Sequence, residues 1–125
     1  MALLKRINSV FIIAGVAFCA TSCGRNSTGT VEVLNKSENI IMGGAIKVCG
    51  EDFYIPMVKQ QESIKFQFAI CADSDYLVKL EISNGQKIQK RLGYITTGIK
   101  HLKDLIVFKK SDIFLERKEL ETGYF

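Results

Sequence analysis

The sequence predicts an all-β domain, a small antiparallel β-sandwich of six to seven strands that follows an N-terminal signal peptide. Three observations support this fold class. Short segments alternate apolar and polar residues, polar or glycine-rich turns separate them, and no long helical period follows residue 22. We therefore divide the chain into a signal peptide over 1–22, a cysteine and short tether over 23–29, and a sandwich over 30–125.

The first 22 residues have the layout of a secretory signal peptide. Lys5 and Arg6 form a positively charged start, an apolar run extends from Val10 to Ala20, and small residues lead to Cys23. The apolar run is shorter than the roughly 20 residues that a membrane-spanning helix needs. We therefore expect residues 1–22 to be removed when the protein is exported.

The residues around the predicted cleavage site, Ala20-Thr21-Ser22-Cys23, resemble the lipobox of bacterial lipoproteins. In that family the peptide is cut before the cysteine, whose sulfur is diacylated and whose new amino group is acylated, often with palmitate. The resemblance implies that Cys23 is lipidated. It also implies retention in the outer membrane, facing the periplasm, because Gly24 is not the aspartate that holds such proteins in the inner membrane. Cleavage by an ordinary signal peptidase at the same bond is the alternative.

Cysteine parity supports lipidation and predicts one disulfide. Cleavage leaves Cys23, Cys49 and Cys71, an odd number for an oxidising compartment, and lipidation of Cys23 leaves a pair. Cys49 and Cys71 fall at strand ends in the polar phase of their alternation. We therefore predict a strand-end disulfide near the surface, stabilising the domain by about 3 to 4 kcal/mol. Two separate buried thiols are the alternative.

Seven segments read as strands because apolar residues recur at every second position or form short runs between turns. Gly43-Gly44 predicts a bulge or bend within the second segment, and Pro56 predicts an edge or exit after the third. The tail from Ser111 to Phe125 fits a short helix or an edge strand equally well. The seven segments are 30–33, 40–49, 53–55, 64–71, 76–82, 88–94 and 102–108.

The turn Ser83-Asn84-Gly85 predicts the register of one hairpin. A two-residue Asn-Gly loop would set core-facing residues opposite charged ones along the whole ladder. A three-residue loop, with Gly85 in the left-handed conformation and a bulge, pairs Leu80 with Ile88 and Tyr76 with Leu92. We therefore predict the three-residue loop.

The rhythm of turns and alternating strands from Thr30 to Phe108 resembles the bacterial immunoglobulin-like sandwiches of exported proteins. The resemblance implies two packed sheets that expose loops and strand edges to partners. The chain has no tryptophan, and Cys49 and Cys71 are close in sequence. It therefore lacks the core disulfide and packing tryptophan of antibody domains.

Composition argues against two classes of function. Removal of Lys5 and Arg6 from 17 basic residues leaves 15 against 13 acidic ones, a net charge of +2, and no basic run is interleaved with aromatics. We therefore expect no nucleic-acid partner. His101 is the sole histidine and no serine has the Gly-x-Ser-x-Gly surroundings of a nucleophile elbow, so we expect neither an enzyme nor a cofactor.

Four acidic residues are candidates for a binding edge. Glu51 and Asp52 follow one cysteine of the predicted disulfide, and Asp73 and Asp75 follow the other. Closing the bridge brings these carboxylates towards one edge, where hard oxygens can bind Ca²⁺. No DxDxDG-type loop fixes a ligand geometry, so we assign no metal and interpret them as solvated turn residues.

Three basic residues are candidates for a second surface. Lys87, Lys90 and Arg91, together with lysines later in the chain, can gather on one face and attract phosphate-bearing headgroups or an acidic partner. Ordinary solubility is the alternative interpretation.

These observations predict a lipid-anchored, non-catalytic module of the cell envelope that binds a protein or another envelope component. The membrane is a partner through the lipid on Cys23. A small periplasmic inhibitor or immunity-type lipoprotein is the alternative, in which Glu51-Asp52 or Asp73-Ser74-Asp75 contacts the blocked enzyme.

Overall fold

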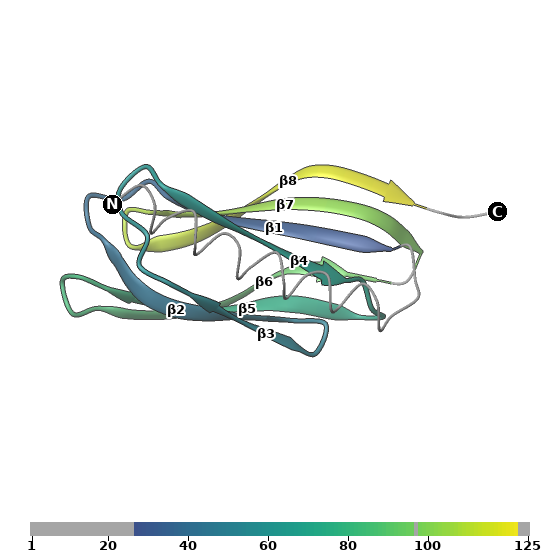
Figure 1. Cartoon of the computed structure of the whole chain (residues 1–125), viewed down its shortest axis with the longest axis horizontal. Helices are drawn as coiled ribbons and strands as arrows, with labels where there is room; N and C mark the ends of the chain where they lie inside the picture. The colour runs from purple at the N-terminus through teal and green to yellow at the C-terminus, as the bar shows by residue number, and fades with distance from the viewer. Residues whose placement is uncertain (1–26, 97, 123–125) are drawn as a thin grey trace, which may run out of the picture.

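In a computed structural model of the protein, two four-stranded sheets face each other as two layers (Figure 1). The structure describes residues 27–96 and 98–122. The predicted signal peptide and Cys23 lie outside them. None of the described segments forms a helix long and apolar enough to cross a bilayer. The strands are β1 (Thr28–Asn35), β2 (Ile41–Val48), β3 (Glu51–Ile55), β4 (Ser63–Ala69), β5 (Ser74–Ile82), β6 (Lys87–Ile95), β7 (Ile99–Lys109) and β8 (Asp112–Thr122).

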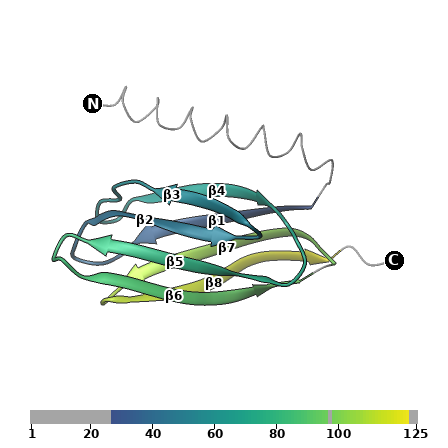
Figure 2. The same ribbon diagram turned by 90° about the horizontal axis from the view of Figure 1, so that it is seen from below.

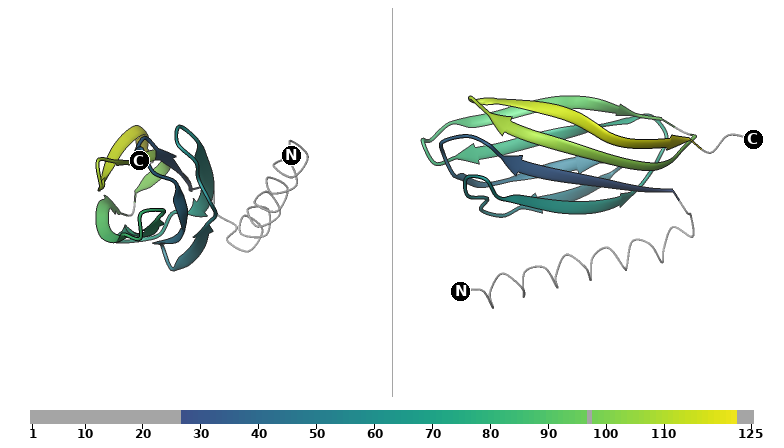
Figure 3. Two further views of the ribbon diagram at one scale, coloured as in Figure 1. Left: turned by 90° about the vertical axis from the view of Figure 1, so that its left-hand side faces the viewer. Right: turned by 90° about the horizontal axis from the view of Figure 1, so that it is seen from above.

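The sheets have the strand orders β4-β1-β7-β8 and β3-β2-β5-β6. Figures 2 and 3 show the second sheet from below and the first from above. The small all-β sandwich is thus confirmed, but one pair corrects the purely antiparallel prediction, because β1 and β7 are parallel. Parallel strands need a long crossover, and here the five strands between β1 and β7 provide it.

The described residues form eight strands, one more than the upper limit predicted. The additional strand is β8, which resolves the ambiguous tail as an edge strand paired antiparallel with β7. β1 also begins at Thr28, two residues before the predicted start of the domain. Gly29 lies within β1, where an added Cβ would collide with the ring of Phe68.

The β5–β6 hairpin confirms the predicted register, with Leu80 opposite Ile88 and Tyr76 opposite Leu92. Gly85 has a φ of +90°, the left-handed conformation that the three-residue loop requires. The β5–β6 ladder has a second irregularity between Ser74 and Tyr76, on the opposite side of which Gly93 has a φ of +75°. The predicted irregularity at Gly43 is also present, as a shift in the β2–β5 register.

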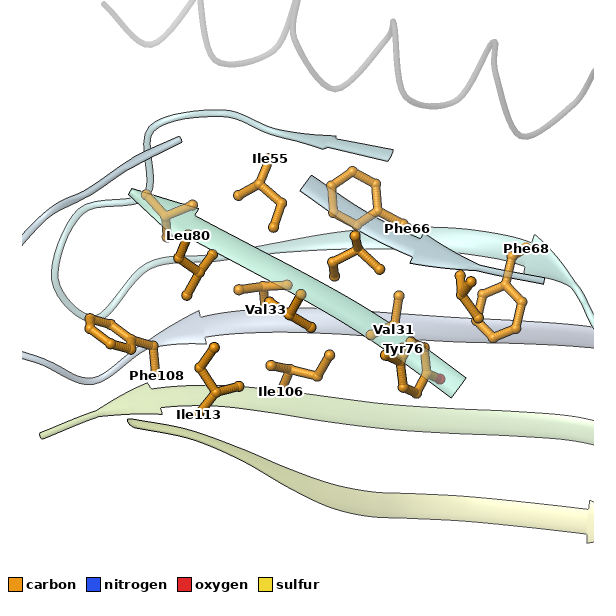
Figure 4. Packing of buried hydrophobic residues seen from close by; sticks show 14 of the residues in the cluster. Val31, Val33, Ile55, Phe66, Phe68, Tyr76, Leu80, Ile106, Phe108 and Ile113 are labelled. Carbon is orange, nitrogen blue, oxygen red and sulfur yellow. The ribbon is translucent and has the colours of Figure 1, made fainter. Parts of the chain in front are cut away.

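The core lies between the two sheets and consists of the inward-facing residues of all eight strands. Figure 4 shows Val31 and Val33 of β1 packed between Ile106 of β7 and residues of the opposite sheet. The rings of Phe68 and Tyr76 meet edge to face, with centroids 5.9 Å apart. Among the described residues, every buried side-chain nitrogen or oxygen has a hydrogen-bond partner.

The predicted disulfide between Cys49 and Cys71 is confirmed, with the two Cα atoms 5.4 Å apart. It joins the end of β2 in one sheet to the chain just after β4 in the other. Both cysteines are half-buried, and Cys49 packs against the edge of the core rather than facing away from it. The reason is that Cys49 has left the extended conformation, with a φ of 50°, so its side chain no longer follows the outward phase of β2.

The immunoglobulin resemblance applies to the two packed sheets and not to the strand order. In the constant-type immunoglobulin fold, strands A, B, E and D form one sheet and C, F and G form the other. In this chain the second and third strands are hydrogen-bonded neighbours in one sheet.

Candidate functional site

The outer face of the β3-β2-β5-β6 sheet contains a hollow of about 530 Å³, which we call the outer groove. Its floor is Gly43, Gly44 and Ala45 of β2. Tyr54 of β3 stands on one side, and residues of β5 and β6 stand on the other. The hollow is within the size range of small-ligand sites.

The groove exists because small residues of β2 lie between larger ones. Ala45 pairs with Tyr54 on one side and with Lys79 on the other, and Lys79 pairs with Gln89. Residues directly opposite each other in a sheet project from the same face. The row across this face is therefore tyrosine, alanine, lysine and glutamine, with its lowest point at Ala45.

Exposed apolar side chains gather at this groove. Tyr54 is 77% exposed and Met42 is 46% exposed. An added Cβ at Gly43 would lie 3.7 Å from the Tyr54 hydroxyl oxygen, so the tyrosine side chain leans along the sheet towards the glycine pair. Met57 is also exposed, and it precedes Val58, which pairs with Ile41 next to Met42. Tyrosine and methionine are enriched in protein interfaces.

The groove carries a small excess of positive charge. Lys87 lies 3.7 Å from Glu81, nitrogen to oxygen, and both side chains are exposed. Lys79, in the middle of the sheet, has no ion-pair partner among the described residues. The residues that line the groove include no histidine, cysteine or serine. The arrangement offers an apolar floor, a phenol and two ammonium groups as binding contacts.

The three basic residues predicted as a surface do not gather on one face. Lys87 and Arg91 are outward-facing on β6, and only Lys87 lines the outer groove. Lys90 is on the opposite face of the strand, where its Nζ donates to Asp112 Oδ1 at 3.1 Å and to the carbonyl of Ile113 at 2.8 Å. It therefore connects β6 to β8 at the open side of the sandwich. The later lysines at 100, 103 and 109 are on β7, in the other sheet.

The four acidic candidates lie near the disulfide end, and three of them have separate partners. The Glu51 carboxylate accepts a hydrogen bond from the Ala69 backbone N–H at 3.4 Å, and Asp73 accepts one from the Tyr94 hydroxyl at 2.8 Å. Asp75 pairs with Arg91 at 3.1 Å. Asp52 is exposed on β3. Within the described ranges no three acidic, histidine or cysteine side chains converge on a possible metal site.

A buried polar cluster of Tyr76, Asp104 and Arg117 was not predicted. Asp104 is 3% exposed and accepts from the Tyr76 hydroxyl at 2.6 Å. Arg117 Nε and Nη2 donate to its two oxygens at 2.8 and 2.9 Å. The signal in the sequence was Asp104 itself, which occupies a core-facing position between Leu102 and Ile106.

The cluster shifts two pKa values. Burial, with a further contribution from the hydrogen bond to Asp104, raises the pKa of Tyr76. The hydrogen bond to Asp104 also raises the pKa of Arg117. Tyr76 lies on β5 in one sheet, whereas Asp104 and Arg117 lie on β7 and β8 in the other. The cluster therefore connects the two sheets by hydrogen bonds.

No protein-family model matches the chain, and no curated protein matches it either. Among solved structures, the chain is similar to an NMR structure of a protein from Eubacterium rectale, with a TM-score of 0.53 and 14% sequence identity. The match covers 81% of this chain and 94% of that one. At this identity the likeness shows the fold alone.

Proposed function

We propose that the protein is a lipid-anchored, non-catalytic binding module of the bacterial cell envelope, held in the outer membrane by Cys23 and facing the periplasm. The outer groove is its contact surface. The observation that carries the proposal is the combination of a glycine and alanine floor with exposed Tyr54 and Met42 on a regular sheet. A rigid sheet face with exposed aromatic and thioether groups suits partner binding.

Two features support export and anchoring. The disulfide between Cys49 and Cys71 is a bond of oxidising compartments such as the periplasm. Pairing these two leaves Cys23 as the one cysteine without a partner in the mature chain, and its surroundings resemble a lipobox. Several acyl chains together give stable membrane attachment.

A lipid on Cys23 would hold the disulfide end of the domain near the membrane. Four residues lie between Cys23 and Thr28, where β1 begins, and an extended chain over these five residue steps spans at most about 18 Å. The start of β1 is at the disulfide end, where Ile70 next to Cys71 donates to the Ser27 carbonyl at 3.3 Å. Gly43 lies five residues along β2 from Val48, about 17 Å from that end. The groove is therefore accessible to a periplasmic partner.

The groove is a better supported contact than the acidic turns on which the inhibitor alternative depends. Glu51 and Asp52 are the first residues of β3 rather than a loop tip. Asp73 and Asp75 are already bonded to Tyr94 and Arg91.

Photo-crosslinking in living cells tests the proposal. A photoreactive phenylalanine analogue replaces Tyr54 in the groove or, as a control, Lys65 on the outer face of the other sheet. We expect a discrete adduct from position 54 and none from position 65. Identical adducts from both positions, or none from position 54, would reject the groove as the contact surface. An adduct that forms only when a toxin or hydrolase is supplied would favour the inhibitor alternative.

A further inference from the structure

We propose that the outer groove binds an extended acidic peptide segment of a partner protein. A carboxylate of the segment pairs with Lys79, and an apolar side chain two residues away packs on Tyr54 and Met42. This inference deepens the proposed function and rests on it, because it specifies the chemistry of the partner.

The charge of the groove selects an anion. Lys79 and Lys87 line it with Glu81 as the sole acidic residue, which leaves one net positive charge. Glu81 lies beside Lys87, at 3.7 Å. The cross-strand neighbours of Lys79 are Ala45 and Gln89, neither of which is acidic. Lys79 is therefore the group best placed to pair with a carboxylate from outside, and Gln89 can add a hydrogen bond.

The floor of the groove favours a peptide over a sugar. The backbones of β2 and β5 are already paired with each other, so Gly43, Gly44 and Ala45 offer mainly apolar surface. A sugar ring carries hydroxyls around its whole edge, and buried hydroxyls without partners are costly. An extended peptide directs alternate side chains to one face and keeps much of its backbone in water. It therefore suits a groove with polar groups along one wall.

The dimensions also match a short segment. Tyr54 on β3 and Gln89 on β6 are three strand spacings apart, or about 14 Å. An extended chain covers that distance in about four residues at roughly 3.3 Å each. Two side chains on the same face of such a chain, at positions i and i+2, reach the apolar and the basic side of the groove.

The test uses a probe peptide with fluorescein on its amino terminus, fluorescein-Gly-Phe-Ser-Glu-Ser-Phe-Ser-Glu-Gly-amide, and the full-length protein in detergent micelles. Fluorescence anisotropy measures the Kd. We expect saturable binding that Lys79→Glu weakens about tenfold or more, because an ion pair becomes a like-charge contact. Lys79→Gln should weaken it less, and Tyr54→Ala should also weaken it. Raising salt should reduce binding, since exposed charges are screened.

Two controls make the result specific. Lys65→Glu changes the same charge on the outer face of the other sheet and should leave Kd within about twofold, because Lys65 does not line the groove and exposed charges are screened by salt. A probe with glutamine in place of glutamate should bind weakly. Equal loss in Lys65→Glu and Lys79→Glu, or no binding of the acidic probe, would overturn the inference. Displacement of the probe by polygalacturonate at lower concentration would overturn it in favour of an acidic glycan.

The outcome is separable from that of the proposed function. If position 54 cross-links in cells while the acidic probe fails to bind, the groove is a contact surface for a partner of different chemistry. If position 54 gives no adduct, the proposed function fails even where the probe binds in vitro.

Discussion

Asp104 is a buried charged residue whose hydrogen bonds connect the two sheets. Its carboxylate receives three hydrogen bonds, one from Tyr76 of the opposite sheet and two from Arg117. A buried carboxylate costs several kcal/mol unless such bonds compensate for the water it has lost. The cluster is therefore stable as a unit and sensitive to the loss of any one member.

Replacing Asp104 with asparagine tests this sensitivity. The change leaves Arg117 without its counter-charge at a half-buried position, and we expect the free energy of unfolding to fall by about 3 kcal/mol. Urea denaturation of a chain that lacks residues 1–23 measures it. Asp112→Asn is the control, because its pair with Lys90 is exposed and should contribute little to stability. An equal loss of unfolding free energy in the two variants would contradict the claim that the buried cluster makes Asp104 unusually important for stability.

The raised pKa of Tyr76 predicts that the folded protein loses stability at alkaline pH. Its pKa is raised above the ordinary value of 10.0, first by burial and then by the hydrogen bond to Asp104. Above pH 10 the unfolded chain ionises this tyrosine while the folded chain keeps it neutral, so its contribution is complete below pH 10 and declines above it. Tyr76→Phe lacks this effect. The difference in unfolding free energy between wild type and Tyr76→Phe should therefore shrink by about 1 kcal/mol from pH 8 to pH 11. A constant difference would contradict the assignment.

The two neighbouring glycines of β2 should respond differently to alanine. An added Cβ at Gly44 would collide with the backbone carbonyl of Lys79, whereas one at Gly43 would lie 3.5 Å from the Ile55 oxygen, an ordinary contact. We expect Gly44→Ala to lower the thermal midpoint, at a cost of about 1 to 3 kcal/mol. Gly43→Ala should leave it nearly unchanged. Similar melting of both variants would mean that β2 and β5 are not so closely spaced.

At the scale of elements, alternation made most strands predictable. The strand before Cys71 was predictable from its regular alternation of apolar and polar residues. The register of the β5–β6 hairpin was predictable because one register alone keeps apolar residues opposite each other, as Leu80 opposite Ile88 confirms. The parallel pairing of β1 with β7 could not be predicted from the sequence, because the alternation within a strand does not depend on which strand lies beside it. β8 was ambiguous because most of its residues face solvent and impose no period.

Among the described residues, the disulfide is the one covalent cross-link between the sheets besides the backbone itself. Cys49→Ser with Cys71→Ser should lower the free energy of unfolding by about 3 kcal/mol, because the reduced chain gains the entropy of an open loop. Denaturant unfolding of this double variant measures the loss. The wild-type protein unfolded in excess reductant should match it. A change below about 1 kcal/mol would indicate that the sheets hold together without the bridge.

At the scale of the whole molecule, the candidate groove could not be predicted from sequence. It results from the lateral order of four strands, which sets Tyr54, Ala45 and Lys79 in one row although they are far apart in the chain. Of the residues predicted as binding candidates, Lys87 alone lines it. The acidic candidates lie near the disulfide, but Glu51, Asp73 and Asp75 have individual partners, which composition does not reveal.

In the proposed function, export and anchoring determine which partners the sandwich can contact. A lipid on Cys23 would hold the domain at the membrane and limit its partners to those of the periplasm. The four residues between that cysteine and Thr28 would then leave the disulfide end within about 18 Å of the bilayer. A chain without the lipid would have no fixed orientation.

Intact mass spectrometry of the protein purified from the cell envelope tests this claim most directly. We predict a mature chain that begins at Cys23, with a diacylglyceryl group on its sulfur and an acyl group on its amino terminus. We also predict that Cys23→Ser abolishes this species. A protein that retains Met1, or one that begins at Cys23 without any acyl mass, would contradict the account.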